Sequence, residues 1–473
     1  MVSDYTPPPV TQATLKGAPY VTVSPVGLAQ GLPRNNNANY GPDTPGTVTS
    51  GIQEAIGYTG TNGGGVIMLL PGKFTISATL VIGNPNIIIT GSGIPSGVKL
   101  SIGETPTNTC VVKLANSVNG SIILISFNGA SPNGSAGFRG CIIEKLTLDG
   151  NGANQTSGNG IDCAAADVML RDIEIRDVKS NGFVNYSTNP PDGGENNCLW
   201  NCFIHDCGSN GVLAQHADTR IVGGEYFGNG GAGINVTAGA GGFECVEANI
   251  YANANGMVLS ANSGSLEHCI IAGTDFDSNA NYGLQLLATT NHISGTTFTG
   301  CTFWNNSTGP GSSAAHVLVD GSVDAVFSGC TFNQASGSPY NNLAGEMIET
   351  LNALGYGISV LGCTFRNANR AISNAFSPYS NIEDCKGYNP QGFGVTTPAF
   401  PTTGTNVQNN NPFPVRIYLL SAGTGTGFTI TDPSGTAQAV TVTLAAGMEF
   451  TLDPGASIQF AYTIAPTWKW YGV

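Results

Sequence analysis

Short runs of alternating apolar and polar residues recur through the middle of the chain. Each run is followed by Asn or Asp, a few small residues, and then Gly with another apolar residue. The polar residues that mark successive units lie 29, 23, 24 and 26 positions apart; they are Asp177, Asp206, Asn229, Asn253 and Asn279. Alternation over so few residues predicts short β-strands, and the regular spacing predicts a repeat architecture.

A repeat of this length fits either a leucine-rich repeat or a parallel β-helix. Leucine-rich repeats contain helix-forming stretches, whereas the units here are rich in Gly, Asn, Thr and Ser, which favour turns. The pattern therefore favours a parallel β-helix, in which every unit is one coil that pairs with the coils before and after it. The polar markers would then stack as an Asn ladder at one turn, and inward Ile, Phe and Cys would form a continuous core.

The cysteines fit this core. The same tetrapeptide, Gly-Cys-Thr-Phe, occurs three times, at 300–303, 329–332 and 362–365. Its Cys and Phe lie on one face of a strand because side chains alternate, and free cysteine behaves there as a small apolar residue. A zinc site is the alternative for Cys198, Cys202, His205 and Cys207. Their spacing matches no common ligand pattern, so we expect buried thiols and no metal.

The N-terminal part of the chain differs from the repeats. Residues 1–45 are rich in Pro, Asn and Gly, which predicts an extended arm. Residues 47–56 place apolar side chains on one helical face, and Ser50 with Gln53 fits a capping box. A short helix is therefore predicted to cover the first coil. Residues 63–76 then predict two strands joined by a Pro-Gly turn.

The repeats stop near Tyr388, which sets the remaining domain boundaries. We predict the β-helix over 46–394 and a linker rich in Pro, Thr and Asn over 395–414. Residues 415–473 contain alternating strands separated by Gly, Pro and Asp. This pattern predicts a small antiparallel β-sandwich.

Charge and composition exclude several function classes. The 473-residue chain has 16 Lys and Arg against 30 Asp and Glu, a net charge of −14, so no nucleic-acid partner is expected. No run of about 18 apolar residues predicts a membrane span. The N-terminus has no basic segment followed by an apolar one, so we expect no signal peptide. The protein would then either stay where it is made, or reach a virion or the cell exterior by another route, such as lysis of the cell.

Residues 52–93 contain the runs IQEAI, GGGVIMLLPGKFTI, LVI and IIITGSG in that order. This segment resembles the opening of the pectate-lyase-like β-helix superfamily, which includes viral tailspikes and polysaccharide depolymerases. The resemblance extends over roughly residues 36–395. The family's Gly-Asp-Gly opening is replaced here by residues 40–45, and the short motifs of polygalacturonases do not occur. Pattern and resemblance together predict an all-β fold: a right-handed parallel β-helix with a short N-terminal cap helix and a C-terminal antiparallel β-sandwich.

Alternation also places one set of side chains on the outer face of each strand, and stacked coils turn these sets into columns. The columns bring together Asp149 and Glu174, two carboxylates that could serve as acid and base or nucleophile in glycoside cleavage. Arg176 and His205 lie beside them, where they would shift the carboxylate pKa values or transfer a proton. The alternative is that all four are solvated surface residues.

A second carboxylate pair and several aromatic residues complete the candidate site. Asp275 and Asp277 are further candidate catalytic residues, or oxygen ligands for calcium, although no dense acidic loop of the EF-hand kind occurs. No other cofactor is expected. The aromatic residues expected on the outer face are Phe203, Tyr226, Tyr251 and Trp304. Their rings can stack on the apolar faces of sugars.

These expectations lead to one functional hypothesis and two alternatives. The resemblance implies a homotrimeric tailspike- or fibre-like virion protein that binds a cell-surface polysaccharide, with cleavage left open. Its N-terminal arm would contact other virion proteins. The C-terminal domain would form trimers or a tip, or else a monomeric cap with Trp468 and Trp470 in its core. The alternatives are a free-standing polysaccharide lyase or glycoside hydrolase, and a structural surface or filament protein.

Overall fold

The structure, a computed structural model, describes most of the chain. It covers residues 19–28, 34–93, 109–126, 140–186, 195–308, 315–334, 346–352, 357–366, 370–372, 380–386, 395–411 and 414–472. Secondary structure in these ranges is nearly all β; the helical segments are α1 (Ile52–Thr61) and two short 3-10 turns, η1 (Arg34–Asn37) and η2 (Gly152–Asn154). None of the helices in these ranges is long and apolar enough to cross a membrane.

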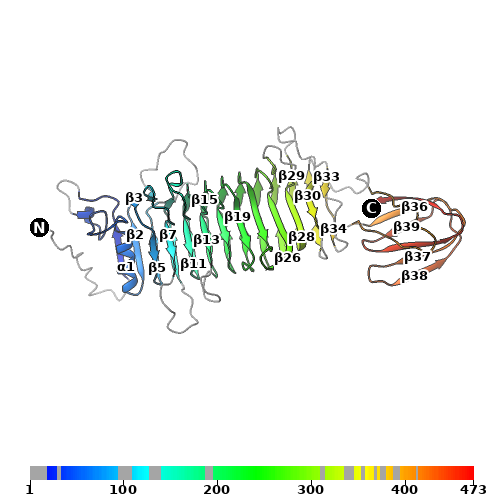
Figure 1. The fold of residues 1–473 in the computed structure, drawn as a ribbon, viewed down its shortest axis with the longest axis horizontal. Helices are drawn as coiled ribbons and strands as arrows, with labels where there is room; N and C mark the ends of the chain where they lie inside the picture. The colour runs from blue at the N-terminus through cyan, green and yellow to red at the C-terminus, as the bar shows by residue number, and fades with distance from the viewer. Residues whose placement is uncertain are drawn as a thin grey trace.

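Two parallel sheets form a solenoid, which Figure 1 shows as a long stack of strands. Sheet B contains β3 (Gly72–Ile76), β6 (Cys110–Leu114), β9 (Thr147–Asp149), β12 (Glu174–Arg176), β15 (Phe203–His205), β18 (Glu225–Phe227), β21 (Asn249–Tyr251), β25 (Asp275–Asp277), β27 (Thr302–Trp304), β29 (Thr331–Asn333) and β32 (Thr364–Arg366). Each of these strands pairs in parallel with the one before it, so one strand of every coil lies in sheet B.

The other strands of the coils form sheet A, which is also parallel. It contains β1 (Tyr20–Val23), β2 (Gly65–Leu69), β4 (Leu80–Ile82), β5 (Ile87–Thr90), β7 (Ile123–Ile125), β8 (Cys141–Glu144), β10 (Ile161–Cys163), β11 (Val168–Arg171), β13 (Phe183–Asn185), β14 (Cys198–Trp200), β16 (Val212–Ala214), β17 (Arg220–Val222), β19 (Ala232–Thr237), β20 (Glu244–Val246), β22 (Asn255–Ser260), β23 (Leu266–Glu267), β24 (Ile270–Ala272), β26 (Leu284–Thr299), β28 (Val317–Ser328), β30 (Glu346–Leu351), β31 (Ile358–Leu361), β33 (Arg370–Ile372) and β34 (Asn381–Glu383). The predicted parallel β-helix is therefore confirmed.

The cap helix forms, but its predicted start and capping box are wrong. Gly51 precedes α1 in a left-handed conformation, with φ of 82°, so the preceding residues cannot continue the helix. Ser50 and Gln53 do not bond to one another's backbone. Their side chains bond instead to the backbone of the neighbouring strands β3 and β4. The helix thereby attaches to the coil that it covers.

Part of the segment predicted as an extended arm joins the first coil. β1 pairs in parallel with β2, so that Tyr20 lies opposite Val66 and Val23 lies opposite Leu69. The side chains of Val21 and Val23 are buried in the solenoid core. Residues 1–18 of the predicted arm lie outside the described residues.

Side-chain ladders fill the solenoid core. The rings of Phe276, Phe303, Phe332 and Phe365 stack on consecutive coils with centroids 4.7 to 4.9 Å apart. This spacing equals the distance between adjacent strands, so each coil adds one ring to the stack. The cysteines are free thiols, and all except Cys198 and Cys385 are buried. The tetrapeptide repeats therefore contribute to the core as expected.

The predicted Asn ladder forms in the later coils and ends on a histidine. The markers Asp177 and Asp206 are not part of it: they lie one residue before the ladder position, which Cys207 occupies in the coil of Asp206. Asn229 donates to Asn253, Asn253 to Asn279, and Asn279 to Asn306, with nitrogen–oxygen distances of 2.9, 3.1 and 2.8 Å. Asn306 occupies the ladder position of the next coil. Its amide nitrogen lies 3.1 Å from Nδ1 of His316. Burial lowers the pKa of His316 to about 3, so its ring is neutral and Nδ1 accepts this bond.

The C-terminal domain is an antiparallel β-sandwich with its own core. One sheet contains β35 (Val407–Gln408), β37 (Gly425–Thr431), β38 (Ala437–Thr441) and β40 (Ser457–Tyr462); sheet D contains β36 (Val415–Ser421), β39 (Glu449–Leu452) and β41 (Thr467–Gly472). Trp468 and Trp470 are in the core, as the monomeric-cap alternative expected. Val395 and Phe400 pack against the same core. Part of the predicted linker therefore belongs to this domain.

Candidate functional site

The outer face of sheet B carries the predicted site residues. On each three-residue strand the middle side chain points into the core and the flanking two point outward. Register places the outward residues in two columns. The first column contains Thr147, Glu174, Phe203, Glu225, Asn249, Asp275 and Thr302. The second contains Lys113, Asp149, Arg176, His205, Phe227, Tyr251, Asp277 and Trp304.

The predicted columns are wrong at one coil. Tyr226 was expected on the outer face, but it pairs with Ile204 and Ile250 and its side chain is fully buried. The outward positions of β18 belong to Glu225 and Phe227. Because two aromatic residues are adjacent here, hydrophobicity alone does not fix which one faces the core. Tyr226 is therefore a core residue and not a sugar-contacting one.

Four of the predicted residues form an ionic cluster. Arg176 lies 3.6 Å from Asp149 and 3.5 Å from Glu174, so one guanidinium bridges both carboxylates. Lys113 approaches Asp149 at 3.0 Å from the preceding strand. Nε2 of His205 lies 3.1 Å from Glu174. Both carboxylate side chains are less than a tenth exposed, so these ion pairs are shielded from water.

His205 is held between two carboxylates. Its Nδ1 lies 3.0 Å from Asp206 and its Nε2 lies 3.1 Å from Glu174. Burial by itself would lower the pKa of His205, but the bonds to Asp206 and Glu174 outweigh burial and raise it. Burial likewise opposes ionisation of Glu174, yet His205, Arg176 and Thr147 together hold the Glu174 pKa below its usual value. Both shifts favour the ionised pair, in which an imidazolium faces a carboxylate.

A stack of rings continues from the ionic cluster along the second column. The ring of His205 stacks on Phe227 at 4.5 Å, and Phe227 stacks on Tyr251 at 4.8 Å, with interplanar angles of 7° and 2°. The Tyr251 hydroxyl donates to Glu225 at 2.8 Å, which fixes the orientation of the last ring. Phe227 and Tyr251 are half-buried. Both rings therefore keep part of their surface available at the outer face.

Sequence reasoning missed Phe227, although a signal for it exists. In the coils of the Asn ladder the outward residue of the second column lies two positions before the ladder Asn. Tyr251 precedes Asn253 in this way, and Trp304 precedes Asn306. Counting back two positions from Asn229 gives Phe227. The ladder thus fixes a register that the aromatic pattern leaves ambiguous.

The second carboxylate pair lies further along the same face. Asp275 and Asp277 follow Asn249 and Tyr251 in the two columns, and Trp304 follows Asp277 with 40% of its surface exposed. Burial and then the neighbouring charge of Asp277 raise the pKa of Asp275. Its Oδ1 is buried and makes no hydrogen bond to any described residue. Burial and the neighbouring carboxylate therefore favour the protonated form of Asp275.

The geometry separates the predicted residues into two groups. The cluster of Asp149, Glu174, Arg176 and His205 occupies β9 to β15, whereas Asp275 and Asp277 lie on β25, with the strands of the ring stack between them. Phe203 is half-buried in the first column between Glu174 and Glu225. Among the residues that the structure describes, no three His, Cys, Asp or Glu side chains are grouped to hold a metal ion.

Comparisons with known proteins support the fold. No sequence family and no curated protein matches the chain. The A-module of mannuronan C-5 epimerase AlgE6 from Azotobacter vinelandii is 18% identical, with a TM-score of 0.53 over 72% of this chain and 95% of that one. The AlgE4 A-module from the same organism is 16% identical, with a TM-score of 0.52 over 71% and 95%.

A viral protein has a comparable structural similarity to this chain. The enzymatically active domain of tailspike protein 2 from bacteriophage CBA120 is 12% identical, with a TM-score of 0.50 over 95% of this chain and 76% of that one. At identities this low, the structural similarity establishes the fold alone, and activity has to be argued from the geometry of the site. The chain is therefore a parallel β-helix protein of the structural type shared by these epimerase modules and this tailspike.

Proposed function

We propose that the protein binds an extended polysaccharide along the outer face of sheet B. The observation that carries the proposal is the row of partly exposed rings formed by Phe227, Tyr251 and Trp304 in one column. From β9 to β27 the strands span roughly 29 Å at the usual spacing of adjacent strands, which is long enough for several sugar residues. Ring faces pack on the apolar faces of sugars, and the flanking charged and amide groups bond to hydroxyls.

Cleavage of the bound chain is the second part of the proposal, and Asp275 with Asp277 is the pair that supports it. Glycoside hydrolysis needs one protonated and one ionised carboxyl group, and the raised pKa of Asp275 suits the acid. The two residues are outward neighbours on one strand, so their Cα atoms lie about 7 Å apart. Asp149 and Glu174 suit this chemistry less well, because each carboxylate is already ion-paired with cationic side chains of neighbouring strands.

A tailspike-like homotrimer is the assembly that we propose. The outer face of sheet A carries a stripe of apolar residues that includes Trp200, which is 49% exposed; Ile270, 46% exposed, lies in the adjacent column opposite Glu244. Val222 and Val246 lie in register beside Trp200 and continue the stripe. A second and third copy would cover this stripe and leave sheet B free for a polysaccharide. The virion location and the contact of the N-terminal arm with other virion proteins form part of the same proposal.

Two tryptophan variants test binding and assembly against each other. We expect Trp304→Ala to weaken polysaccharide binding roughly fivefold, since one stacked ring contributes about 1 kcal/mol, and to leave the molecular mass in solution unchanged. We expect Trp200→Ala to leave polysaccharide binding unchanged and to lower the molecular mass in solution. Affinity electrophoresis in gels containing acidic or neutral polysaccharides, together with light scattering, reads both properties. Unchanged binding by Trp304→Ala would contradict the site, and a stable monomer of the unmodified protein would contradict the trimer.

A carboxylate variant tests cleavage. Asp275→Asn should abolish the release of reducing ends from any polysaccharide that the protein degrades. Asp324→Asn is the matched control, because Asp324 is exposed on sheet A and should leave the rate unchanged. Full activity of Asp275→Asn, or no cleavage of a polysaccharide that is bound, would refute the catalytic part of the proposal. Absorbance of unsaturated products would indicate a lyase in place of a hydrolase.

A further inference from the structure

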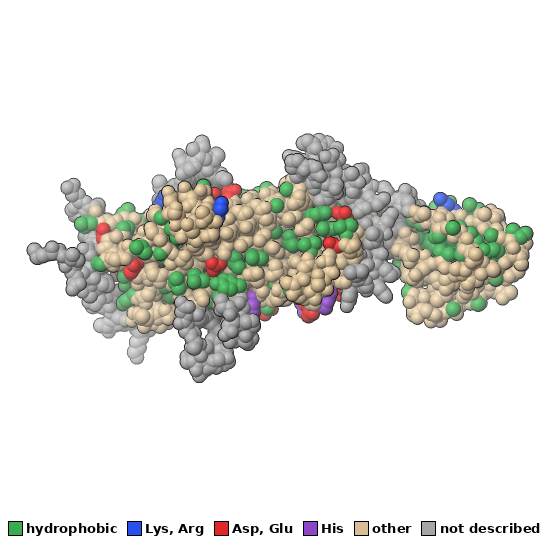
Figure 2. All heavy atoms as spheres, in the orientation of Figure 1, with side chains coloured by type: hydrophobic (Ala, Val, Ile, Leu, Met, Phe, Trp, Pro, Cys, Tyr) green, Lys and Arg blue, Asp and Glu red, His purple; other side chains and the backbone are tan. Residues whose placement is uncertain are grey.

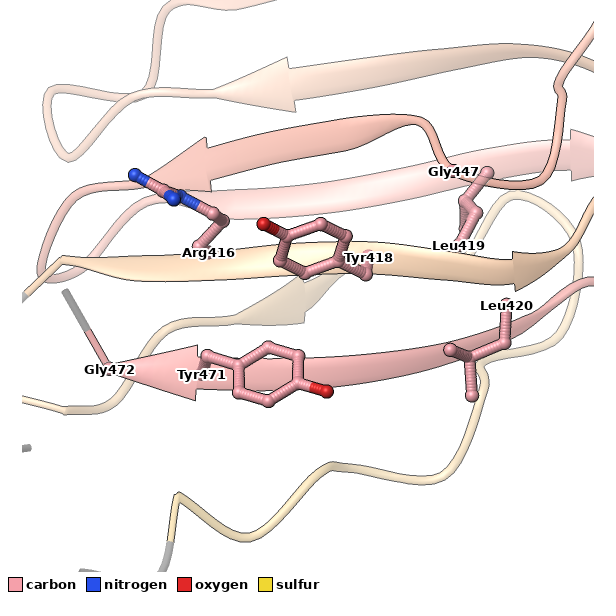
Figure 3. A pocket seen from close by; sticks show the side chains of 7 residues that line it. All are labelled: Arg416, Tyr418, Leu419, Leu420, Gly447, Tyr471 and Gly472. Carbon is pink, nitrogen blue, oxygen red and sulfur yellow. The ribbon is translucent and has the colours of Figure 1, made fainter. Parts of the chain in front are cut away.

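A pocket of about 610 Å³ opens on the outer face of sheet D, in the C-terminal domain. It is lined by Arg416, Tyr418, Leu419, Leu420, Gly447, Tyr471 and Gly472 (Figure 3). The lining comes mainly from the antiparallel pair β36 and β41. Ile417 and Trp470 point to the opposite side of this sheet and are buried. The pocket therefore lies on the outward side of sheet D, although Leu419, a residue of the sandwich core, contributes to its lining.

Two tyrosine rings form the walls of the pocket. Tyr418 and Tyr471 lie on adjacent strands with ring centroids 5.4 Å apart and an interplanar angle of 90°. Figure 3 shows the hydroxyl of Tyr418 on the side of Arg416 and that of Tyr471 on the side of Leu420. Tyr471 is 44% and Leu420 60% exposed. Ring faces, hydroxyl groups and an apolar side chain are thus all available in one hollow.

The charge around the pocket is unusual for this chain. Arg416 lines it, and Lys469 lies opposite Tyr418 on the same outward side of sheet D. Glu449 lies 3.8 Å from Arg416, and both side chains are about half exposed, so this contact leaves the guanidinium open to another anion. The whole protein has only 16 basic residues against 30 acidic ones, and Figure 2 shows how sparse charged side chains are on the visible surface.

We propose that this pocket is a saccharide-binding site for an acidic sugar residue, distinct from the face of sheet B. The guanidinium of Arg416 binds the carboxylate of the sugar, because its planar fork matches a carboxylate. The rings of Tyr418 and Tyr471 pack on the sugar ring from two directions, and their hydroxyls bond to its hydroxyls. Gly447, at φ of 86°, leaves open space at the rim, since nothing lies within 4 Å of its Cβ position.

The experiment uses the full-length chain and calorimetric titration with trigalacturonate, with galactotriose as the neutral counterpart. We expect trigalacturonate to bind and galactotriose to bind at least tenfold more weakly. Arg416→Gln should weaken trigalacturonate binding about tenfold, as loss of one charge-assisted bond predicts. Tyr471→Ala should weaken it several-fold. Lys179→Gln, at an exposed lysine between β12 and β13, is the control and should bind as the unmodified protein does.

The results also separate this site from its main alternative, a contact between copies of the chain. Equal binding by Arg416→Gln and the unmodified protein would overturn the proposal, as would equal affinity for both trisaccharides. An assembly that dissociates in Tyr471→Ala, with no trigalacturonate binding by the unmodified protein, would assign the pocket to an interface and also overturn it. Because the substituted residues Arg416 and Tyr471 lie on sheet D and not on sheet B, a failure of the polysaccharide proposal leaves this test unaffected.

Discussion

Replacement of Glu174 by Gln tests the account of the ionic cluster. The substitution keeps the shape of the side chain and an oxygen that can accept the hydrogen bond from Thr147, but it removes the charge that faces His205 at 3.1 Å and Arg176 at 3.5 Å. His205 and Glu174 are almost fully buried, with side-chain exposures of 2% and 5%. Solvent therefore screens the interaction between these two side chains only weakly. A hydrogen bond to a charged group contributes about 2 kcal/mol, which is the expected loss of unfolding free energy.

The loss should depend on pH, because both groups titrate. The Glu174 pKa is lowered from 4.5 in the folded state, so its contribution is complete above pH 4.5 and disappears as pH falls through the folded value. The His205 pKa is raised from 6.5, so its contribution is complete below pH 6.5 and disappears as pH rises through the folded value. The pair therefore contributes most between pH 4.5 and 6.5. At pH 9 the effect of Glu174→Gln should be smaller.

Urea unfolding at pH 5.5 and pH 9 measures this difference, and NMR titration of the His205 ring should show a lower pKa in the variant. Glu267→Gln is the matched control, because Glu267 faces His292 at 3.7 Å in an exposed pair, whose contribution is at most about 1 kcal/mol. An equal loss at both pH values, or a loss no larger than that of Glu267→Gln, would refute the buried ion pair.

Three further substitutions or modifications test the interior of the solenoid. Asn253→Ala should lower the unfolding free energy, measured in urea, by about 3 kcal/mol, because buried amides on both neighbouring coils lose a hydrogen-bond partner. The control Asn262→Ala, at an exposed amide, should lower it by less than about 1 kcal/mol. Tyr226→Phe should leave stability unchanged or raise it slightly in thermal unfolding, since the buried hydroxyl has no hydrogen-bond partner among the described residues. Burial raises the pKa of Cys245 to about 12, so this thiol should resist alkylation by iodoacetamide at pH 8, whereas the half-buried Cys198 should react faster. Mass spectrometry measures both rates, and equal rates would contradict the packed core.

The sequence was sufficient for the fold because one signal repeats in every coil. Alternation predicts the strands, the polar markers predict the period, and the Cys and Phe positions predict the core. An error in one coil, such as the position of Tyr226, therefore does not change the predicted fold. The cap helix had no such redundancy. Its start depended on Gly51, whose left-handed conformation is a property of one residue that periodicity does not report.

The candidate site could be predicted only in part. Asp149, Glu174, Arg176 and His205 come together because parallel register stacks equivalent positions, which the repeats specify. Which carboxylate is favoured to hold a proton depends on burial and on neighbouring charges, and the sequence gives neither the burial nor the distances. The pocket on sheet D was beyond prediction for a related reason. It depends on the antiparallel register of β36 and β41, which no repeat reinforces.

The central claim is that the outer face of sheet B binds a polysaccharide. The most direct measurement is a crystal structure of the protein with oligosaccharides prepared from the polysaccharide that binds most tightly in the electrophoretic panel. We predict that a sugar chain lies along the second column, with rings packed on Phe227, Tyr251 and Trp304 and with one glycosidic oxygen near Asp275. A sugar chain bound to another face of the solenoid, with this column unoccupied, would contradict the account.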